Sequence, residues 1–379
     1  MDFELTEEQK MIKNMARDFA ENEVRPIAAE IDEEDYFPWD LINKAGDLGF
    51  MGMTVPEEYG GAGIDRISYI LVLEEISRVS GGMGLTLEAH NSLGVGHIYE
   101  RGTEEQKEKY LPNLTSGEAV AAWALTEPNA GSDAASIETT AEKEGDEWVI
   151  DGTKQFITSG SLADVVIVMA KTEKGKGAKG ISAFIVEEDN PGLEYGVEEN
   201  KLGMRGSVTS ELFFEECRVP EENMLDEEGR GFIGAMDILD RGRTAISALA
   251  LGIAQGALDE SIDYSKQREQ FGRPISKFQA IQWKIADMAT EIEAARLLTY
   301  RAACLEDEGK DFGKEASMAK LFTSETSSQV AREAIQILGG YGYTKEYPVE
   351  RFFRDAKLCE IGEGTSEVQR RVIAKHLGL

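Results

Sequence analysis

Apolar residues recur at helical spacing along the first third of the chain. Met11, Met15 and Phe19 repeat every four residues, behind a Thr6 and Gln9 pair that is typical of a helix capping box. The same period is found over 39–49, 68–79, 85–99 and 104–114, with a glycine-rich break at 81–84. These segments predict an α-helical N-terminal domain over residues 1–120.

Beyond residue 120 the pattern changes to that of strands. Short runs rich in β-branched and aromatic residues lie at 148–150, 154–157, 165–170, 181–186 and 212–219. Asp151-Gly152 separates the first two runs and has the chemistry of a type I′ turn, which predicts a hairpin there. The segment 175–180 matches G-x-G-x-x-G, but β-type runs stand on both sides, so it predicts a hairpin loop and not a dinucleotide site. We expect a middle domain of antiparallel strands, a β-barrel or sandwich, over 121–227.

Long helical periods return in the last part of the chain. They cover 231–267, 275–308, 313–338 and 366–377. Long helices with short links are typical of a four-helix bundle, here over 228–379. The fold class is therefore α+β multidomain: an α-helical N-terminal domain, an antiparallel β middle domain and a C-terminal four-helix bundle.

Charge and composition narrow the possible partners. The 379 residues include 71 acidic and 40 basic ones, a net charge of −31 that disfavours nucleic acid and anionic membranes and would suit a salty habitat. The three cysteines and three histidines show no ligand or disulfide spacing, so no metal site is expected. The acidic N-terminus does not resemble a signal peptide, and no apolar run approaches the ~20 residues of a membrane span. We expect a cytoplasmic protein whose few Arg and Lys gather where an anionic ligand binds.

One carboxylate occupies an unusual local setting. Glu363 lies between Gly362 and Gly364, directly before a helix start at Thr365-Ser366. Because glycines let the backbone approach a flat or bulky partner, the pattern indicates a catalytic base that faces a bound cofactor. The alternative is an ordinary acidic first turn, in which the glutamate only interacts with the helix dipole.

Two other segments offer hydroxyl and aromatic groups to a ligand. The loop 125–133 carries hydroxyls at Thr126 and Ser132, and it could direct them and its backbone N–H groups at a polar edge. Phe156 and Thr158 are two residues apart on a strand, so they should point the same way and could stack on and hydrogen-bond to one ring. The plainer interpretations are a capped loop and a strand end with one core aromatic.

Three helical segments have features suited to anions. One of them contains a helix-weakening glycine, Gly242, that is flanked by Asp240, Arg241 and Arg243. Two arginines beside a glycine indicate the close approach of an anionic group. The segment 268–274 joins the first two long helices. The segment 336–342 ends the third, where its glycines leave backbone N–H groups free.

Together these segments resemble the acyl-CoA dehydrogenase family, most closely its short-chain, butyryl-CoA type. The resemblance covers the whole chain and rests on the loop around Ser132, the strand end at Thr158, Arg268 with Phe271, the 336–340 turn and the E-G-T-S-E run at 363–367. It implies the three-domain fold described above, with FAD bound between the β domain and the bundle. It also implies a homotetramer built as a dimer of dimers, with a role in fatty acid β-oxidation.

The resemblance assigns a role to individual residues. The implied cofactor contacts within one subunit are Trp123, Leu125, Thr126, Gly131, Ser132, Phe156, Thr158, Thr365 and Glu367. Those that would reach the FAD of the neighbouring subunit are Arg268, Gln279, Gln336, Gly339 and Gly340, with Phe271 a further cofactor contact. The implied substrate contacts are Ser132, Asp240, Arg243, Glu88, Gly362 and Gly364, of which Asp240 and Arg243 would hold the pantetheine.

Glu363 matches the catalytic base of the family. It would take the α-proton of an acyl-CoA thioester while the flavin accepts a hydride from the β-carbon, and the electrons would pass to electron-transfer flavoprotein. Hydrogen bonds to the thioester carbonyl must stabilise the enolate-like charge in a site without water. The helix dipole should lower the pKa of Glu363 and desolvation should raise it. The alternatives are an acyl-CoA oxidase that uses oxygen, although many oxidases carry an extra C-terminal domain, and a flavin-free binding scaffold.

Departures from the family pattern concern the acyl pocket. Gly362 stands where many relatives have Tyr, which predicts a wider pocket, and Phe156 stands where many have Trp. Gly84 replaces the Arg with which glutaryl-CoA members hold a second carboxylate, so a dicarboxylyl substrate is not expected. Glu88, four residues later, is either a solvated acid or a second pocket carboxylate for a branched or cyclic acyl group. The expected substrate has a short or medium acyl chain.

Overall fold

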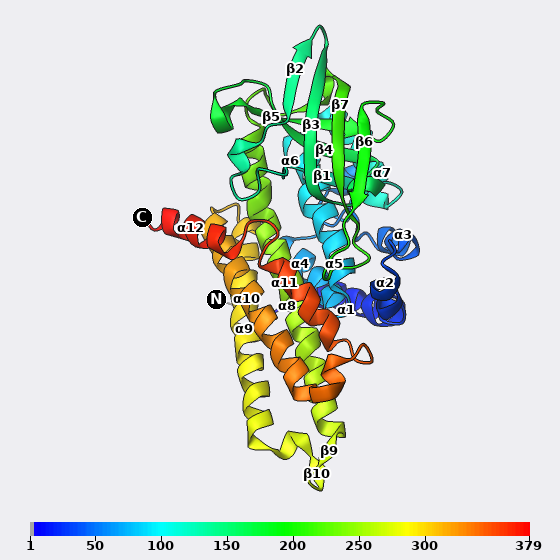
Figure 1. Ribbon diagram of the computed structural model, residues 1–379, viewed down its shortest axis with the longest axis vertical. Coiled ribbons are helices and arrows are strands. Elements are labelled where there is room, and N and C mark those ends of the chain that lie inside the picture. Colours follow the sequence, from blue (N-terminus) through cyan, green and yellow to red (C-terminus); the bar gives the residue numbers. More distant parts are fainter. Residues whose placement is uncertain (1–3) are drawn as a thin grey trace.

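The molecule has the predicted order of helices, strands and helices. The computed structural model describes residues 4–379, so the first three residues of the acidic N-terminal segment lie outside the described part. The strands of the middle of the chain gather at one end, and the long C-terminal helices extend to the other (Figure 1). The three-domain fold class is thereby confirmed, whereas the exact limits at 120 and 227 stay a prediction.

The N-terminal part is helical, as predicted. Its α-helices are α1 (Glu7–Phe19), α2 (Ala28–Glu34), α3 (Trp39–Asp47), α4 (Arg66–Ser77), α5 (Gly81–Glu88), α6 (Gly96–Arg101) and α7 (Glu104–Ser116). The capping box is confirmed, because the Gln9 amide donates to Thr6 Oγ1 at 3.2 Å and the Thr6 amide donates to Gln9 Oε1 at 3.0 Å. No helix in residues 4–379 is both long and apolar enough to cross a membrane.

The glycine-rich segment 81–84 was expected to interrupt the helices, and this was wrong. The segment begins α5, with Ser80 as its N-cap. Glycine is needed there for close packing, since a Cβ at Gly82 would overlap the carbonyl of Arg205 and one at Gly84 would overlap Ser77. A π-helical stretch (Ala89–Val95) then connects α5 to α6.

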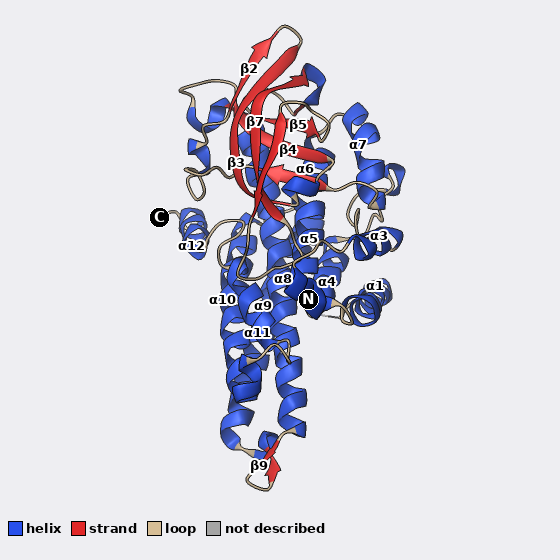
Figure 2. Ribbon diagram, turned by 45° about the vertical axis from the view of Figure 1, so that its right-hand side comes forward, coloured by secondary structure: helices blue, strands red, loops and turns tan. Residues whose placement is uncertain are grey.

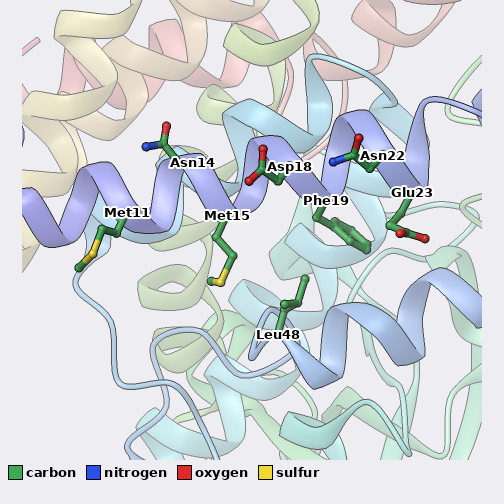
Figure 3. A pocket seen from close by; sticks show the side chains of 8 residues that line it. All are labelled: Met11, Asn14, Met15, Asp18, Phe19, Asn22, Glu23 and Leu48. Atoms are coloured by element: carbon green, nitrogen blue, oxygen red, sulfur yellow. The ribbon is translucent and has the colours of Figure 1, made fainter.

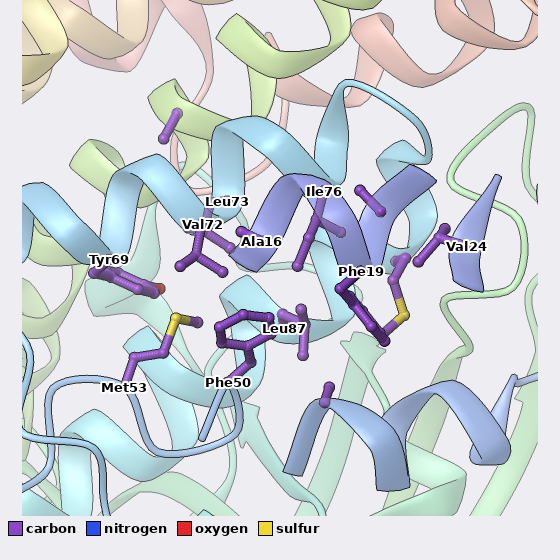
Figure 4. Packing of buried hydrophobic residues seen from close by; sticks show 14 of the residues in the cluster. Ala16, Phe19, Val24, Phe50, Met53, Tyr69, Val72, Leu73, Ile76 and Leu87 are labelled. Atoms are coloured by element: carbon purple, nitrogen blue, oxygen red, sulfur yellow. The ribbon is translucent and has the colours of Figure 1, made fainter. Parts of the chain in front are cut away.

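The helical N-terminal part is held by one hydrophobic cluster. Phe19 of α1 lies edge-on to Phe50, with ring centroids 5.9 Å apart. Val72 and Ile76 of α4 lie in the same cluster and are fully buried (Figure 4). The cluster also contains Ala245 of the C-terminal bundle, so α4 and α5 are packed against the bundle without a gap.

The middle of the chain forms a mostly antiparallel sheet. Its strands are β1 (Ala121–Ala124), β2 (Thr140–Glu144), β3 (Glu147–Thr158), β4 (Val165–Lys171), β5 (Ile181–Glu187), β6 (Leu193–Glu198), β7 (Thr209–Pro220) and β8 (Met224–Leu225). The strand order is β6-β7-β3-β2-β4-β5-β8, and β1 pairs with β4 in the parallel direction. Figure 2 shows these strands together above the helices.

The hairpin predicted at Asp151-Gly152 was wrong. Strand β3 continues through both residues, and β7 pairs with it on either side of a register shift. The side chain of Asp151 accepts a hydrogen bond from the Glu216 amide of β7 at 2.8 Å. These two residues, which are common in turns, therefore lie at a bulge-like irregularity within a long strand. The β2–β3 turn is formed instead by Gly145 and Asp146. The loop 175–180 joins the antiparallel strands β4 and β5, as predicted.

The C-terminal helices differ from the prediction in one member. They are α8 (Gly231–Gln267), α9 (Gln279–Asp307), α10 (Gly313–Leu338), α11 (Val349–Cys359) and α12 (Ser366–His376). Helix α11 was not predicted, yet it packs on both α8 and α10 through buried Phe352, Ala356 and Cys359. Helix α12 packs on α10 and projects to the side at the C-terminus (Figure 1). Five of the eleven residues of α11 are charged, so the spacing of its apolar residues did not indicate a buried helix.

Candidate active site

A hollow of about 1380 Å³ lies where the sheet meets the bundle. Its walls come from β1, β3, α5, α8 and the turn between α11 and α12. Of the residues predicted for the site, it brings together Trp123, Leu125, Thr126, Gly131, Ser132, Phe156, Thr158, Glu88, Arg243, Gly362, Glu363, Gly364 and Thr365. The predicted residues thus converge from five separate stretches of sequence.

Other predicted residues do not line this hollow. Asp240 forms an ion pair with Arg243, and Glu367 is exposed on the first turn of α12. The rest are Arg268, Phe271, Gln279, Gln336, Gly339 and Gly340, which lie toward the opposite end of the bundle, where β9 (Glu269–Gln270) and β10 (Arg273–Pro274) form a small hairpin (Figure 1). Phe271 is 93% exposed there. One protomer therefore does not unite all predicted cofactor contacts.

The turn that carries Glu363 has an unusual backbone. Glu363 has φ 54° and Gly364 has φ 94°, so two consecutive residues lie in the left-handed region. Three hydrogen bonds hold this turn: Gln369 Nε2 donates to the carbonyls of Glu363 (3.1 Å) and Gly364 (2.9 Å), and Lys320 Nζ donates to the carbonyl of Gly364 (2.7 Å). The Thr365 side chain caps α12 by accepting the Val368 amide at 3.3 Å.

The carboxylate of Glu363 lies against the backbone of α8. A Cβ at Gly242 would overlap Glu363 Oε2 and would lie 2.9 Å from its Cδ. Gly242 was predicted to allow the close approach of an anionic group. The anionic group that lies against it in this structure is the carboxylate of Glu363. Both carboxylate oxygens of Glu363 are buried, and within residues 4–379 no amide N–H or alcohol O–H donates to them; the neighbouring donor is the Glu88 carboxyl group.

Glu88 is a buried neighbour of Glu363, so the interpretation as a solvated acid was wrong. It ends α5 at 1% exposure, and Ser92 Oγ donates to its Oε1 at 2.5 Å. Burial, followed by repulsion from Glu363, raises the pKa of Glu88 well above its usual value. The pKa of Glu88 is raised further than that of Glu363, which favours the neutral form of Glu88 beside an ionised Glu363.

Glu363 itself is subject to opposing effects. Burial raises its pKa, while a hydrogen bond from Glu88 and the charges of Lys320 and Arg243 lower it. Desolvation outweighs the others, so the net pKa is raised. A carboxylate with a raised pKa is a stronger base than one in water, which suits proton abstraction.

A buried ion pair holds the loop 125–133 against β3. Lys154 is wholly buried, and its Nζ donates to Glu127 Oε1 at 2.7 Å and to the carbonyl of Leu125 at 3.1 Å. Glu127 also accepts the amide of Thr139 at 3.0 Å. The hydroxyl-bearing loop is therefore fixed from behind, which sequence reasoning missed.

Two aromatic side chains of the hollow, Phe156 and Trp123, are positioned in different ways. Phe156 has φ 58° at a register shift in β3, so the regular alternation expected to align it with Thr158 does not hold. Both residues still line the hollow, and Phe156 is 61% exposed. Trp123 Nε1 donates to Nδ1 of His97 at 2.8 Å. Burial lowers the pKa of His97 to about 3, which keeps it a neutral acceptor.

The wall beside Glu363 is apolar and opens at Gly362. Side chains that sequence reasoning missed here are Leu85, Ala89, Leu93, Leu239, Ile246 and Leu358, since their helical spacing resembles that of ordinary core positions. A Cβ at Gly362 would meet only Leu358, at 3.6 Å or more, which is ordinary contact. The backbone therefore does not require glycine at this position, and its effect is the space it leaves.

Basic side chains line the same hollow despite the acidic composition of the chain. They are Lys201, Arg243, Arg354, Lys357, Arg371 and Lys375. Arg354 is paired with Asp32 and Glu350, whereas no ion pair of Arg371 or Lys375 occurs within residues 4–379. The hollow is thus suited to an anionic ligand.

A smaller open groove lies between α1 and α3, away from these residues. Met11, Met15 and Leu48 lie along it, with Asp18 and Glu23 beside them (Figure 3). Its lining has no basic or hydroxyl side chain. The groove offers no group for the chemistry expected of Glu363.

Comparison with known families gives matches over nearly the whole chain. Residues 6–118 match the model "Acyl-CoA dehydrogenase, N-terminal domain", 122–217 the middle domain and 229–378 the C-terminal domain. The short-chain-specific acyl-CoA dehydrogenase of Clostridium acetobutylicum is 53% identical, over 99% of each chain. The 3-(aryl)acrylate reductase of Clostridium sporogenes is 50% identical, over 98% of this chain and 99% of the other.

Two solved structures are similarly close. The butyryl-CoA dehydrogenase of Megasphaera elsdenii has a TM-score of 0.98 and 48% identity, over 100% of both chains. A chain of a structure described for the electron transferring flavoprotein of Acidaminococcus fermentans has a TM-score of 0.98 and 52% identity, over 100% of this chain and 99% of that one.

Proposed function

The chain belongs to the acyl-CoA dehydrogenase family, and on this premise we propose that it uses FAD to convert an acyl-CoA thioester into a 2-enoyl-CoA, with Glu363 as the base. The observation that carries the proposal is the buried carboxylate of Glu363, held at a left-handed turn on the wall of a large hollow. Aromatic and hydroxyl side chains line the same hollow, which supports a flavin site there.

The residues present fit FAD. Ligand pockets usually enclose ~300–1000 Å³, and the hollow of about 1380 Å³ leaves room for a flavin besides an acyl chain. Trp123 and Phe156 would hold the ring, and the hydroxyls of Thr126, Ser132 and Thr158 would bond to its polar edge. When bound, FAD supplies the hydride acceptor.

The protein groups around Glu363 account for proton abstraction. A hydrogen bond from Glu88 and the positive charges of Lys320 and Arg243 favour its ionised form before reaction. The carboxylate would take the α-proton on one of its two buried oxygens. The backbone N–H of Glu363 has no hydrogen-bond partner in the described part of the chain, so it is free to donate to the thioester carbonyl, where negative charge develops.

Electron-transfer flavoprotein is the proposed electron acceptor, in a homotetramer. The similar chain from the structure described for an electron transferring flavoprotein supports this partner. Phe271 and Tyr343 are about nine-tenths exposed at the far end of the bundle (93% and 88%), as expected if a neighbouring subunit and its FAD cover them. Oxidase activity is the alternative. Anaerobic turnover with an artificial acceptor, without peroxide in air, would separate the two, and a colourless purified protein would instead favour a flavin-free scaffold.

The proposed substrate has a short or medium acyl group with a branch or ring. The space at Gly362 and the apolar wall beside Glu363 support it. So does the 50% identity to an enzyme named for 3-arylacrylates, whose ring is attached at the β-carbon. A panel of linear, branched, cyclic and aryl acyl-CoAs, tested by anaerobic bleaching of the flavin, would identify the preferred class.

Filling the space at Gly362 should change this preference. In Gly362→Tyr we expect turnover of branched or ring-bearing acyl-CoAs to fall ~10–200-fold relative to butyryl-CoA, because the phenol would occupy their place. Gly362→Ala adds only an ordinary contact with Leu358 and is the matched control. Equal changes in kcat/KM for linear and cyclic substrates would contradict the proposed specificity.

Replacing Glu88 should shift the pH dependence of the reaction. Activity is lost as pH falls through the raised pKa of Glu363, because only the ionised carboxylate is a base. Glu88→Ala removes the hydrogen bond that lowers this pKa, so the acidic limb of kcat/KM should move to higher pH. Glu88→Gln keeps an N–H donor and should move the limb less.

The direction of that shift is decisive. A limb that moves to lower pH in Glu88→Ala would mean that Glu88 is ionised and repels Glu363. Unchanged turnover of every acyl-CoA in Glu88→Ala would exclude any role of Glu88 in the pocket.

A further inference from the structure

Lys320 is a buried cation that does not itself line the hollow. It lies within α10, its side chain is wholly buried, and its Nζ donates to the carbonyl of Gly364 at 2.7 Å. Within residues 4–379 it forms no ion pair with a carboxylate. An unpaired buried ammonium group is unfavourable, so its presence beside the Glu363 turn calls for a functional reason.

The charged groups around Lys320 come from several elements. Arg243 of α8 opposes its charge, while Glu363 and Glu360 favour it, and the Cys359 thiol of α11 lies nearby. Burial lowers the pKa of Lys320 to about 8, so the amine is still mostly protonated at neutral pH. In return its charge lowers the pKa of Glu363, as does the hydrogen bond from Glu88.

The hydrogen bond alone does not explain a lysine at this position. Gln369 already donates to the carbonyls of both Glu363 and Gly364 without carrying a charge. A neutral donor on α10 could complete the same turn. What Lys320 adds is a positive charge one residue from the carboxylate that must be ionised.

We propose that Lys320 is a positioning residue for proton abstraction. Its hydrogen bond to Gly364 holds the left-handed turn, and its charge keeps the Glu363 carboxylate ionised and ready to accept the α-proton. This inference rests on the proposed role of Glu363 as the base. It assigns to α10 a part in the chemistry although no side chain of that helix lines the hollow.

Three substitutions in the FAD-loaded enzyme separate charge from hydrogen bonding. Lys320→Gln keeps an N–H donor and removes the charge, Lys320→Met removes both, and Lys320→Arg keeps both. We expect the acidic limb of kcat/KM to move to higher pH in the Gln and Met variants, with roughly tenfold loss of kcat/KM below the limb. KM and flavin content should stay near wild-type values, and the Arg variant should keep the wild-type limb.

Lys154→Met is the matched control. Lys154 is also wholly buried, and burial lowers its pKa to about 8 as well, but it holds the loop 125–133 through Glu127. Its replacement should weaken flavin retention without moving the acidic limb in the molecules that keep flavin. The control thus distinguishes the loss of any buried lysine from the loss of this one.

The outcomes also separate this proposal from the proposed function. A wild-type pH profile in Lys320→Gln, with Glu363→Gln inactive, would overturn the inference alone. Normal turnover in Glu363→Gln would overturn the role of Glu363 and the inference with it. If the Gln and Met variants do not fold, Lys320→Arg provides the test, because it retains the positive charge. An acidic limb of kcat/KM that stays at the wild-type pH in this variant would support the proposal. A limb that moves to higher pH would overturn it.

Discussion

Glu363→Gln is expected to bind flavin and to lose about 10⁴-fold in kcat, the upper end of what a general base contributes. Glutamine has nearly the same shape, so the turn held by Gln369 and Lys320 should persist. The amide cannot take a proton from a thioester α-carbon. Anaerobic addition of butyryl-CoA and of a ring-bearing acyl-CoA should therefore leave the yellow flavin spectrum unbleached.

A carboxylate elsewhere on the same part of the bundle provides the control. Glu325 of α10 is exposed and pairs with Arg370, so Glu325→Gln should bleach as the wild type does. Normal bleaching in Glu363→Gln would refute its role as the base. Loss of the flavin itself in that variant would show that Glu363 serves cofactor binding instead.

Gly242→Ala should cost about 10²-fold in kcat, as expected for a misplaced catalytic group. The added methyl group would overlap the Glu363 carboxylate, which lies directly on α8 at this point. Alanine favours a helix over glycine by ~1 kcal/mol, so α8 itself should not be weakened. Thermal unfolding should separate the two effects, with kcat reduced and Tm maintained.

The double variant makes this prediction specific. If Gly242→Ala acts only by displacing Glu363, it should add little to the loss already caused by Glu363→Gln. Additive losses in Gly242→Ala/Glu363→Gln would place its effect elsewhere in the site. Full activity in Gly242→Ala would mean that the carboxylate does not need its present position.

The order of domains followed from the spacing and type of the apolar residues, which change from helical to strand-like and back along the chain. Helix α11 was missed because charged residues occur on its buried face as well as its outer one: Arg354 pairs with Asp32, whereas Asp355 is buried and accepts the Met204 amide. Asp151-Gly152 is a sequence typical of turns wherever it occurs. Here it lies inside strand β3, because β7 pairs with β3 on both sides of it. Local sequence could not decide between these outcomes.

The candidate site was predictable where one short stretch carries the signal. Glu363 between two glycines is such a stretch, and the structure gives its backbone the left-handed conformation. Glu88 lies 275 residues earlier, so its burial against Glu363 depends on how α5 packs against the bundle. Lys320 reaches the same turn from a third element. Contacts between distant segments of this kind have no signature in local composition.

In the proposed reaction, Glu363 and FAD act on the two faces of one acyl-CoA thioester. The most direct test mixes the purified holoenzyme, without oxygen, with a limiting amount of an accepted acyl-CoA, and counts reduced flavin and 2-enoyl-CoA in the same sample. We expect one 2-enoyl-CoA for each flavin reduced. A protein that carries no flavin, or a flavin that no acyl-CoA of the panel reduces, would contradict it.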